Sequence, residues 1–246
     1  MRTADPDRPD PEEIELKLVV LDRAAIRKLI KDPSAFLPGV MPLGPARTVD
    51  FRDQYLDTAR GALAKAGFVA RIRTGDGARR LTIKSLARGG QGAVHRRLEL
   101  EGDAGQAQDA RYPADARGLG NAGDVGDPHG WPSSAARDRL LDAIGINPLV
   151  TLATLQQRRL QRNVALETSV IELSLDEVEV VRPDGIPEHW VELECELKSG
   201  HEADLAALGV LLTRRPDLTP ATTSKLERAL VAASASFTER SSFTER

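Results

Sequence analysis

Charged side chains recur at every second position in five short segments of the 246-residue chain. The residues that share this spacing are Glu13, Glu15 and Lys17; Arg71 and Arg73; Thr82 and Lys84; Arg97, Glu99 and Glu101; and Glu192, Glu194 and Glu196. Alternate residues of a strand share one face, so each segment is expected to present its charges together. Leu, Ile and Val occupy most of the intervening positions and would form the opposite, apolar faces.

Two kinds of chemistry suit these side chains. Carboxylate oxygens are hard ligands that bind Mg²⁺ or Mn²⁺, whereas Arg and Lys bind phosphate oxygens. A cavity that holds both would fit a metal-bound polyanion, such as a nucleotide or a polyphosphate, and phosphoryl transfer requires little else. The alternative is a solvated sheet surface laced with salt bridges. Repeated Glu on one face repels unless cations offset it, which favours the enclosed arrangement.

The elements that must position these residues are mainly strands. Alternation and composition predict strands over residues 14–20, 50–57, 63–73, 81–85, 93–101, 149–164, 168–175, 177–182 and 188–197. Helices are expected over residues 22–31, 134–144, 202–212 and 224–233. About eight antiparallel strands joined by hairpins favour an α+β fold, mainly β, with flanking helices and either a closed barrel or a strongly curved sheet.

The chain is expected to form one domain with irregular ends. Residues 1–11 are predicted to be a disordered lead, residues 12–233 the domain, and residues 234–246 a disordered tail that repeats SFTER. Within the domain, residues 103–132 are rich in Gly and are predicted to form a loop insertion outside the barrel.

Composition limits the classes of function. The net charge is −3, from 34 basic and 37 acidic residues, which argues against a general nucleic-acid binder. The sequence has neither an apolar run of about 18 residues nor a secretory signal, so no membrane association is expected. The single Cys195 fits a reducing cytoplasm. The sequence fixes no oligomeric state and allows a homodimer.

An ordered set of motifs resembles the CYTH superfamily, also called triphosphate tunnel metalloenzymes. The resemblance covers residues 12–230 and begins with Glu13-x-Glu15-x-Lys17. The later motifs, in chain order, are Tyr55-x-Asp57-Thr58, Arg71-x-Arg73, Thr82-x-Lys84, Arg97-x-Glu99-x-Glu101, Arg158-Arg159, Leu175-Asp176-x-Val178, Glu192-x-Glu194 and Ser224-Lys225.

This resemblance implies a tunnel-shaped barrel that acts on a triphosphate with divalent metal, Mg²⁺ or Mn²⁺. The implied metal ligands are Glu13, Glu15, Glu99, Glu101, Asp176, Glu192 and Glu194. Phosphates would be held by Lys17, Arg71, Arg73, Lys84, Arg97, Arg158, Arg159 and Lys225. Catalysis would rest chiefly on Glu13, Glu15, Lys17, Arg73 and Lys84. Arg158 and Arg159 lie on opposite faces of a straight strand, and Arg158 is slightly favoured.

Three functions remain open at this point. Hydrolysis of inorganic triphosphate is the simplest, because a tunnel suits a slim linear chain. An adenylate cyclase, or a thiamine or nucleoside triphosphatase, would use the same site. A non-catalytic polyphosphate-binding module is less favoured, because both acidic and basic sets are present.

Overall fold

The computed structural model describes residues 12–75, 77–86, 94–105, 125–181 and 188–232. The predicted lead, the predicted tail and most of the Gly-rich insertion therefore lie outside the described residues. The strands are β1 (Glu12–Val20), β2 (Val40–Thr58), β3 (Phe68–Gly75), β4 (Ala78–Ser85), β5 (Val94–Asp103), β6 (Leu149–Leu166), β7 (Ser169–Val180), β8 (Glu188–Ser199) and β9 (Leu218–Pro220). The helical segments are α1 (Arg23–Lys31), η1 (Pro33–Ala35), α2 (Ala62–Lys65), η3 (Pro128–Gly130), α3 (Ala135–Ile144), α4 (Glu202–Thr213) and residues 225–232.

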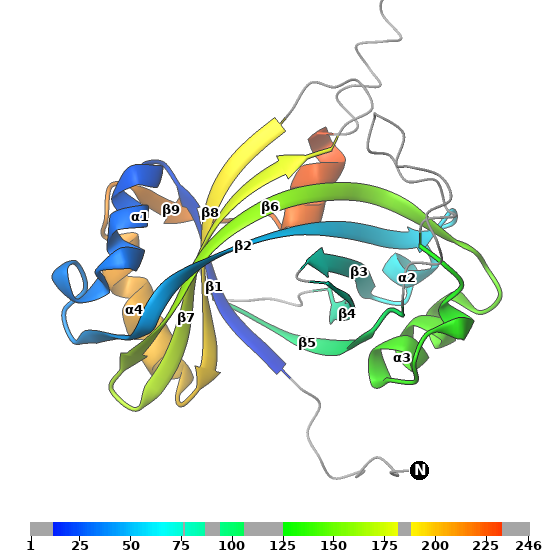
Figure 1. Ribbon diagram of the computed structural model, residues 1–246, viewed down its shortest axis with the longest axis horizontal. Helices are drawn as coiled ribbons and strands as arrows, with labels where there is room; N and C mark the ends of the chain where they lie inside the picture. Colours follow the sequence, from blue (N-terminus) through cyan, green and yellow to red (C-terminus); the bar gives the residue numbers. More distant parts are fainter. Residues whose placement is uncertain (1–11, 76, 87–93, 106–124, 182–187, 233–246) are drawn as a thin grey trace, which may run out of the picture.

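One antiparallel sheet closes on itself to form a barrel (Figure 1). Its strand order is β5-β4-β3-β2-β6-β7-β8-β1, and β1 returns to pair with β5 through Glu13 and Arg97. The other half of the same β1 edge pairs with β9, where Leu18 lies opposite Pro220. The predicted mainly β, closed barrel with flanking helices is confirmed.

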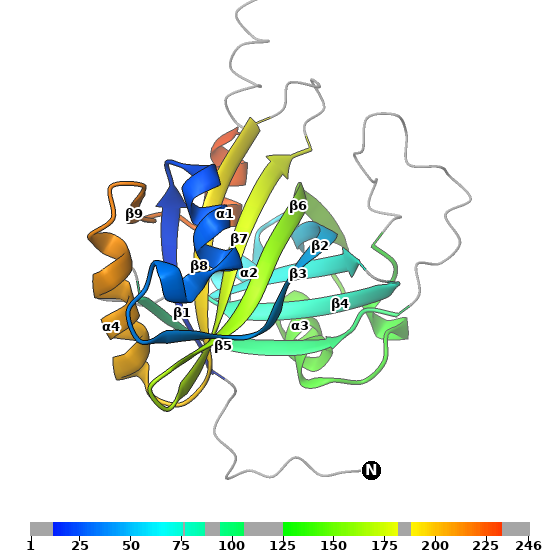
Figure 2. The same ribbon diagram turned by 60° about the vertical axis from the view of Figure 1, so that its left-hand side comes forward.

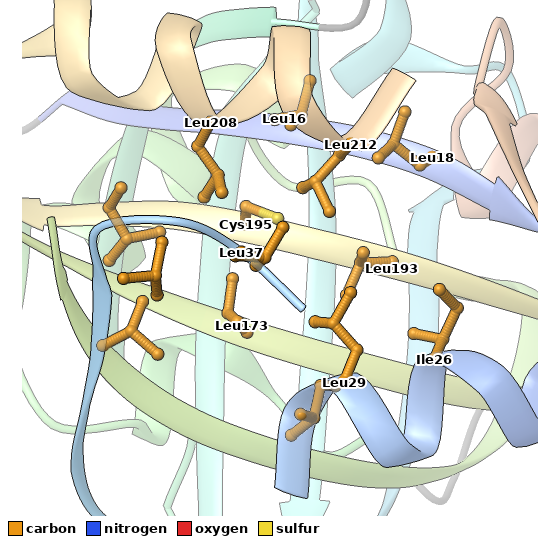
Figure 3. Packing of buried hydrophobic residues seen from close by; sticks show 14 of the residues in the cluster. Leu16, Leu18, Ile26, Leu29, Leu37, Leu173, Leu193, Cys195, Leu208 and Leu212 are labelled. Atoms are coloured by element: carbon orange, nitrogen blue, oxygen red, sulfur yellow. The ribbon is translucent and has the colours of Figure 1, made fainter. Parts of the chain in front are cut away.

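Helices cover the apolar outer faces of the barrel. On one side α1 and α4 pack on β1, β6, β7 and β8, and on the other side α2 and α3 pack on β3, β4 and β5 (Figure 2). Figure 3 shows the first of these cores, where side chains of both helices meet the strands. Its fully buried members include Leu18, Ile26, Leu29, Leu193 and Leu208. Because this packing uses the outer faces, the polar residues lie on the inner faces, together with a smaller apolar cluster that includes Leu155, Val178 and Trp190.

The 225–232 helix closes part of the barrel interior (Figure 1, orange-red). Ser224 and Glu227 form a reciprocal capping box, in which each side chain accepts a hydrogen bond from the other's backbone N–H at 3.2 and 2.7 Å. Ala229 and Ala232 then pack on Trp190 and its apolar neighbours. This packing places Lys225, the first residue of the helix, inside the barrel.

Several strand boundaries differ from those predicted. The segments 168–175 and 177–182 form one strand, β7, because Asp176 stays in the ladder opposite Arg159 and Glu192. The strand predicted over 50–57 is longer in the structure, where β2 begins at Val40. Pairing with β6 extends it through a stretch that contains Pro and Gly and has no alternation of apolar and polar residues. The segment 63–73 begins with the short helix α2 before β3.

The described ends of the Gly-rich insertion belong to the packed domain. Ala104, Val125 and Trp131 are buried in the core that holds α3. This core lies on the outer faces of the barrel, so the described ends pack against its outside, and residues 106–124 lie outside the described part of the chain. No described helix combines the length and apolar character needed to cross a membrane.

Leu193 provides a test of the outer core. The change Leu193→Ala removes a fully buried side chain from the contact between β8 and α1, and we expect it to lower the free energy of unfolding by about 2–5 kcal/mol. Urea denaturation followed by circular dichroism measures this change. The control is Val210→Ala, at a half-exposed position of α4, with an expected effect below about 0.5 kcal/mol. Equal effects would contradict the described packing.

Candidate functional site

The barrel encloses a charged cavity of about 990 Å³. Nine basic and ten acidic side chains of the described residues line it. They come mainly from alternate positions of β1, β3, β4, β5, β7 and β8, together with Arg159 of β6 and Lys225 of the 225–232 helix. The predicted sorting of charge onto one set of strand faces therefore produces an enclosed polar site.

The first group of charges joins β1, β4 and β5. Glu13 accepts hydrogen bonds from Lys84 at 2.6 Å and from Arg97 at 2.9 Å. Arg97 also contacts Glu15, and Lys84 lies 3.2 Å from Glu99. These five residues are opposite or diagonal neighbours in the β1–β5 and β4–β5 ladders. Their proximity follows from strand register.

The second group surrounds the end of the 225–232 helix. The ammonium of Lys225 lies 2.6 Å from Asp176, 2.9 Å from Glu192 and 3.1 Å from Glu194. Arg159 makes a bidentate pair with Asp176, both contacts at 2.7 Å, and reaches Glu194 at 2.7 Å. Lys17 links the two groups, because it lies 3.0 Å from Glu194 and 3.3 Å from Glu15.

The third group is centred on Asp53 of β2, which has no exposed surface. Its carboxylate accepts two hydrogen bonds from Arg73, both at 2.8 Å, and one from Gln157 at 2.6 Å. Arg71 donates to the same carboxylate at 3.4 Å and to Thr82 at 3.3 Å. The guanidinium of Arg73 also lies 3.8 Å from the ring centroid of Phe51.

These contacts keep most of the interior groups ionised. Burial raises the pKa of Glu13, but Lys84 and Arg97 offset this effect and lower it below its usual range. Burial likewise raises the pKa of Glu194, but the charges of Lys17 and Lys225 outweigh burial, and the net pKa is well below its usual value. Burial lowers the pKa of Lys84 more than Glu13 raises it. For Glu192 and Glu99, burial is the dominant effect and the pKa is raised.

The structure brings most of the residues identified from the motifs into one region. Twelve of the predicted metal and phosphate ligands line the cavity: Glu13, Glu15, Lys17, Arg71, Arg73, Lys84, Arg97, Glu99, Glu101, Arg159, Glu194 and Lys225. Asp176 and Glu192 lie behind Lys225 and are buried. Glu101 borders the cavity, but its side chain is 45% exposed and pairs with Arg80, away from the acidic groups.

Arg158 is not part of this site. Its side chain is 60% exposed and lies 3.9 Å from Asp50. Arg159 points inward, as its contacts with Asp176 and Glu194 show. The slight preference for Arg158 was wrong, because the strand β6 alternates regularly here and Arg159 shares the inner face with Gln157.

Other site residues were not identified from the motifs. Asp53 is the most connected of them, and its position two residues before Tyr55 places it on the same face of β2. Alternation within the predicted strand 50–57 was therefore sufficient to find it. Glu172 and Lys198 also line the cavity, but nothing in their local sequence separates them from ordinary surface residues.

Carboxylates in this region could hold a metal ion. Asp176, Glu192 and Glu194 each offer an oxygen atom within 4.8 Å of the others. Such a set of hard oxygen donors is chemically suited to a divalent cation. However, Lys225 and Arg159 already contact these three carboxylates. Glu13 and Glu15 of β1 add further carboxylates near Glu194, which Lys17 connects to Glu15.

The fold and the site define a class of protein, a closed antiparallel barrel whose interior carries paired acidic and basic side chains. The family model described as the CYTH domain matches residues 12–230. The chain therefore belongs to the CYTH family. No curated protein sequence matches it.

Solved structures support the fold. A Hippeastrum protein described as an adenylyl cyclase candidate with a dominant triphosphatase activity is similar, with 23% identity and a TM-score of 0.61. The similarity covers 90% of this chain and 96% of that chain. An adenylate cyclase candidate from Bacillus halodurans is similar at 17% identity and a TM-score of 0.52, over 88% of this chain and 97% of that one.

The buried Asp53 makes stability depend on pH. Burial raises the pKa of Asp53, but Arg71 and Arg73 reverse this effect and lower it from 3.8 to about 2. Because the pKa of Asp53 is lower in the folded state, its stabilising effect is fully present above the pKa of the unfolded state. The effect is lost as the pH falls through the pKa of the folded state. We expect Asp53 to contribute about 2 kcal/mol, lost between roughly pH 4 and pH 2.

Urea unfolding measured from pH 5 to pH 2.5 tests this expectation. The stability of the wild type should fall more steeply than that of Asp53→Asn. Asp50→Asn, on the same strand but with a side chain that is 74% exposed, should follow the wild type. Parallel curves for all three proteins would contradict the assigned role of the carboxylate.

Proposed function

We propose that the protein hydrolyses a linear triphosphate inside the tunnel with the aid of a divalent metal ion. The observation that carries this proposal is the continuous set of enclosed cations along the cavity. Their members are Lys17, Arg71, Arg73, Lys84, Arg97 and Arg159, and none of these side chains is more than 24% exposed. Several fixed cations in one enclosed space match the charge of a triphosphate.

Glu13, Glu15 and Glu194 are the residues that we propose to hold Mg²⁺ or Mn²⁺. Their carboxylates contact the cations of Lys84, Arg97 and Lys17 in the structure. When bound, the metal would neutralise phosphate charge and polarise a phosphoryl group. The remaining acidic partners, Asp176 and Glu192, would keep Lys225 and Arg159 in place.

The chain's own residues have separate roles in this proposal. Arg71, Arg73 and Arg159 bind and orient phosphate oxygens, and their charges stabilise the negative charge that develops as the terminal phosphoryl group transfers. Glu99 lines the cavity, and burial raises its pKa, so its carboxylate is suited to accept a proton from the attacking water. We propose the cytoplasm as the compartment, since Cys195 is free and buried.

An organic triphosphate is the second candidate substrate. Part of the cavity wall is apolar, with Tyr55, Phe68, Leu86, Leu226 and Leu230 among its lining residues. This surface could pack against a base or another organic group while the phosphates occupy the charged part. It favours a nucleoside or thiamine triphosphate, or cyclisation of a nucleotide, over a bare phosphate chain. The polyphosphate-binding module remains the non-catalytic alternative.

A substrate panel separates these candidates. Phosphate release and nucleotide products would be measured for tripolyphosphate, ATP, GTP and thiamine triphosphate, each with Mg²⁺, with Mn²⁺ and with excess chelator. We expect metal-dependent release of phosphate from tripolyphosphate. Cyclic AMP as the main product would favour the cyclase, and tight binding without any turnover would favour the binding module.

Two substitutions test the assigned site. Glu15→Gln removes a proposed metal ligand and Arg73→Ala removes a proposed phosphate ligand, so each should lower kcat/KM by about 100-fold or more at alkaline pH with Mg²⁺. Arg158→Ala is the matched control, because this neighbour of Arg159 lies outside the tunnel and its loss should leave activity within about twofold. Full activity in both site variants would rule out the assignment.

A further inference from the structure

Asp53 is one of two fully buried acidic groups among the described residues of the tunnel wall, with Asp176, and nothing in the proposed reaction uses it directly. It has no exposed surface and does not line the cavity, whereas Arg71 and Arg73 do. It therefore has no access to substrate or metal. Its four hydrogen bonds all come from side chains, two of which are proposed phosphate ligands.

The contacts of Asp53 fix the direction of both arginines. The Nε and Nη2 of Arg73 pair with its two carboxylate oxygens, each at 2.8 Å, so the protons on Nη1 remain for a ligand in the cavity. The Nη1 of Arg71 donates to the same carboxylate, while Nη2 donates to Thr82. A guanidinium group is planar and rigid, so these contacts set its whole orientation.

Further contacts hold the carboxylate of Asp53 itself. The Nε2 of Gln157 donates to Asp53 at 2.6 Å, and Gln157 is 3% exposed. The ring of Phe51 lies against the guanidinium of Arg73 on the side of β2. Asp53 and Arg73 are also direct partners in the β2–β3 ladder, so backbone register and side-chain pairing support the same geometry.

We propose that Asp53 is a positioning residue for the phosphate-binding arginines, fixing Arg71 and Arg73 in the orientation in which they meet the substrate. This inference rests on the proposed function of the tunnel. A buried ion pair that served only the fold would lower stability without a selective effect on turnover. If Asp53 positions the arginines, its removal should selectively lower turnover, because the arginine charges remain while their alignment is lost.

Asp53→Asn separates these two roles through kcat and KM. We expect kcat for tripolyphosphate to fall by about 30-fold or more while KM stays within about threefold, because charge attraction persists and alignment does not. Asp50→Asn is the control, with the same change on the same strand at an exposed position. A wild-type kcat in folded Asp53→Asn, or a loss confined to KM, would overturn the proposal.

Gln157→Leu covers the case in which Asp53→Asn does not fold. It removes the amide that holds the carboxylate and leaves both ion pairs in place, so a smaller loss in kcat, about 3- to 10-fold, is expected. In addition, Asp53→Asn made in the Arg73→Ala variant should lower kcat by less than about threefold, because Arg73, one of the two side chains that Asp53 aligns, is already absent. Unchanged kcat in Gln157→Leu, or full additivity in the double variant, would overturn the proposal.

A spectroscopic measurement keeps this inference separate from the proposed reaction. In ¹H–¹⁵N spectra the Nε–H of Arg73 should exchange slowly with water in the wild type and in Asp50→Asn, and rapidly in Asp53→Asn, because only that change removes its acceptor. If the wild type releases no phosphate from any triphosphate, the proposed function fails, and this exchange still reports on Asp53. Slow exchange that survives the loss of the Asp53 carboxylate would overturn the positioning role.

Discussion

The structure depends on the pairing of buried charges inside a closed barrel. Isolated charges in such an interior would be strongly destabilising, and most of them here have partners of opposite sign, whereas Asp57 accepts hydrogen bonds from backbone N–H groups instead. Glu194 illustrates this balance, because it meets Lys17, Lys225 and Arg159 at once. The ion pairs hold these side chains in fixed positions, and they are exchangeable. A metal ion could replace the cations beside the carboxylates, and a polyanion could replace the carboxylates beside the cations.

The rest of the fold serves this interior. Closure of the sheet removes its edges and gives every strand an inner face that solvent reaches only through the cavity. Most of the apolar residues are then buried outside the barrel by α1, α4, α2 and α3, and a smaller apolar cluster that includes Trp190 lies on the inner faces against the 225–232 helix. The 225–232 helix adds apolar packing at one end and delivers Lys225 to Asp176, Glu192 and Glu194.

Strand alternation was sufficient to predict much of this arrangement. The faces of Glu13 and Arg73 follow directly from period-two spacing, whereas the number of strands allowed a strongly curved sheet and only the family resemblance implied the closed barrel. Contacts between residues on different strands were harder to predict from the sequence, because they depend on the register in which the strands pair. Arg159 contacts Asp176 because β6 and β7 pair as a hairpin that places the two residues opposite each other. The break predicted at Asp176 failed for the same reason, since a charged residue inside a strand is tolerated where a cation lies opposite.

The location of a bound triphosphate tests the central claim most directly. A crystal of the protein grown with a non-hydrolysable triphosphate analogue and Mn²⁺ would reveal the metal by its anomalous scattering. We expect Mn²⁺ beside the carboxylates of Glu13, Glu15 and Glu194, with the phosphates against Arg71 and Arg73 inside the tunnel. An analogue bound only on the outer surface, or a tunnel whose ion pairs are unchanged, would contradict the account.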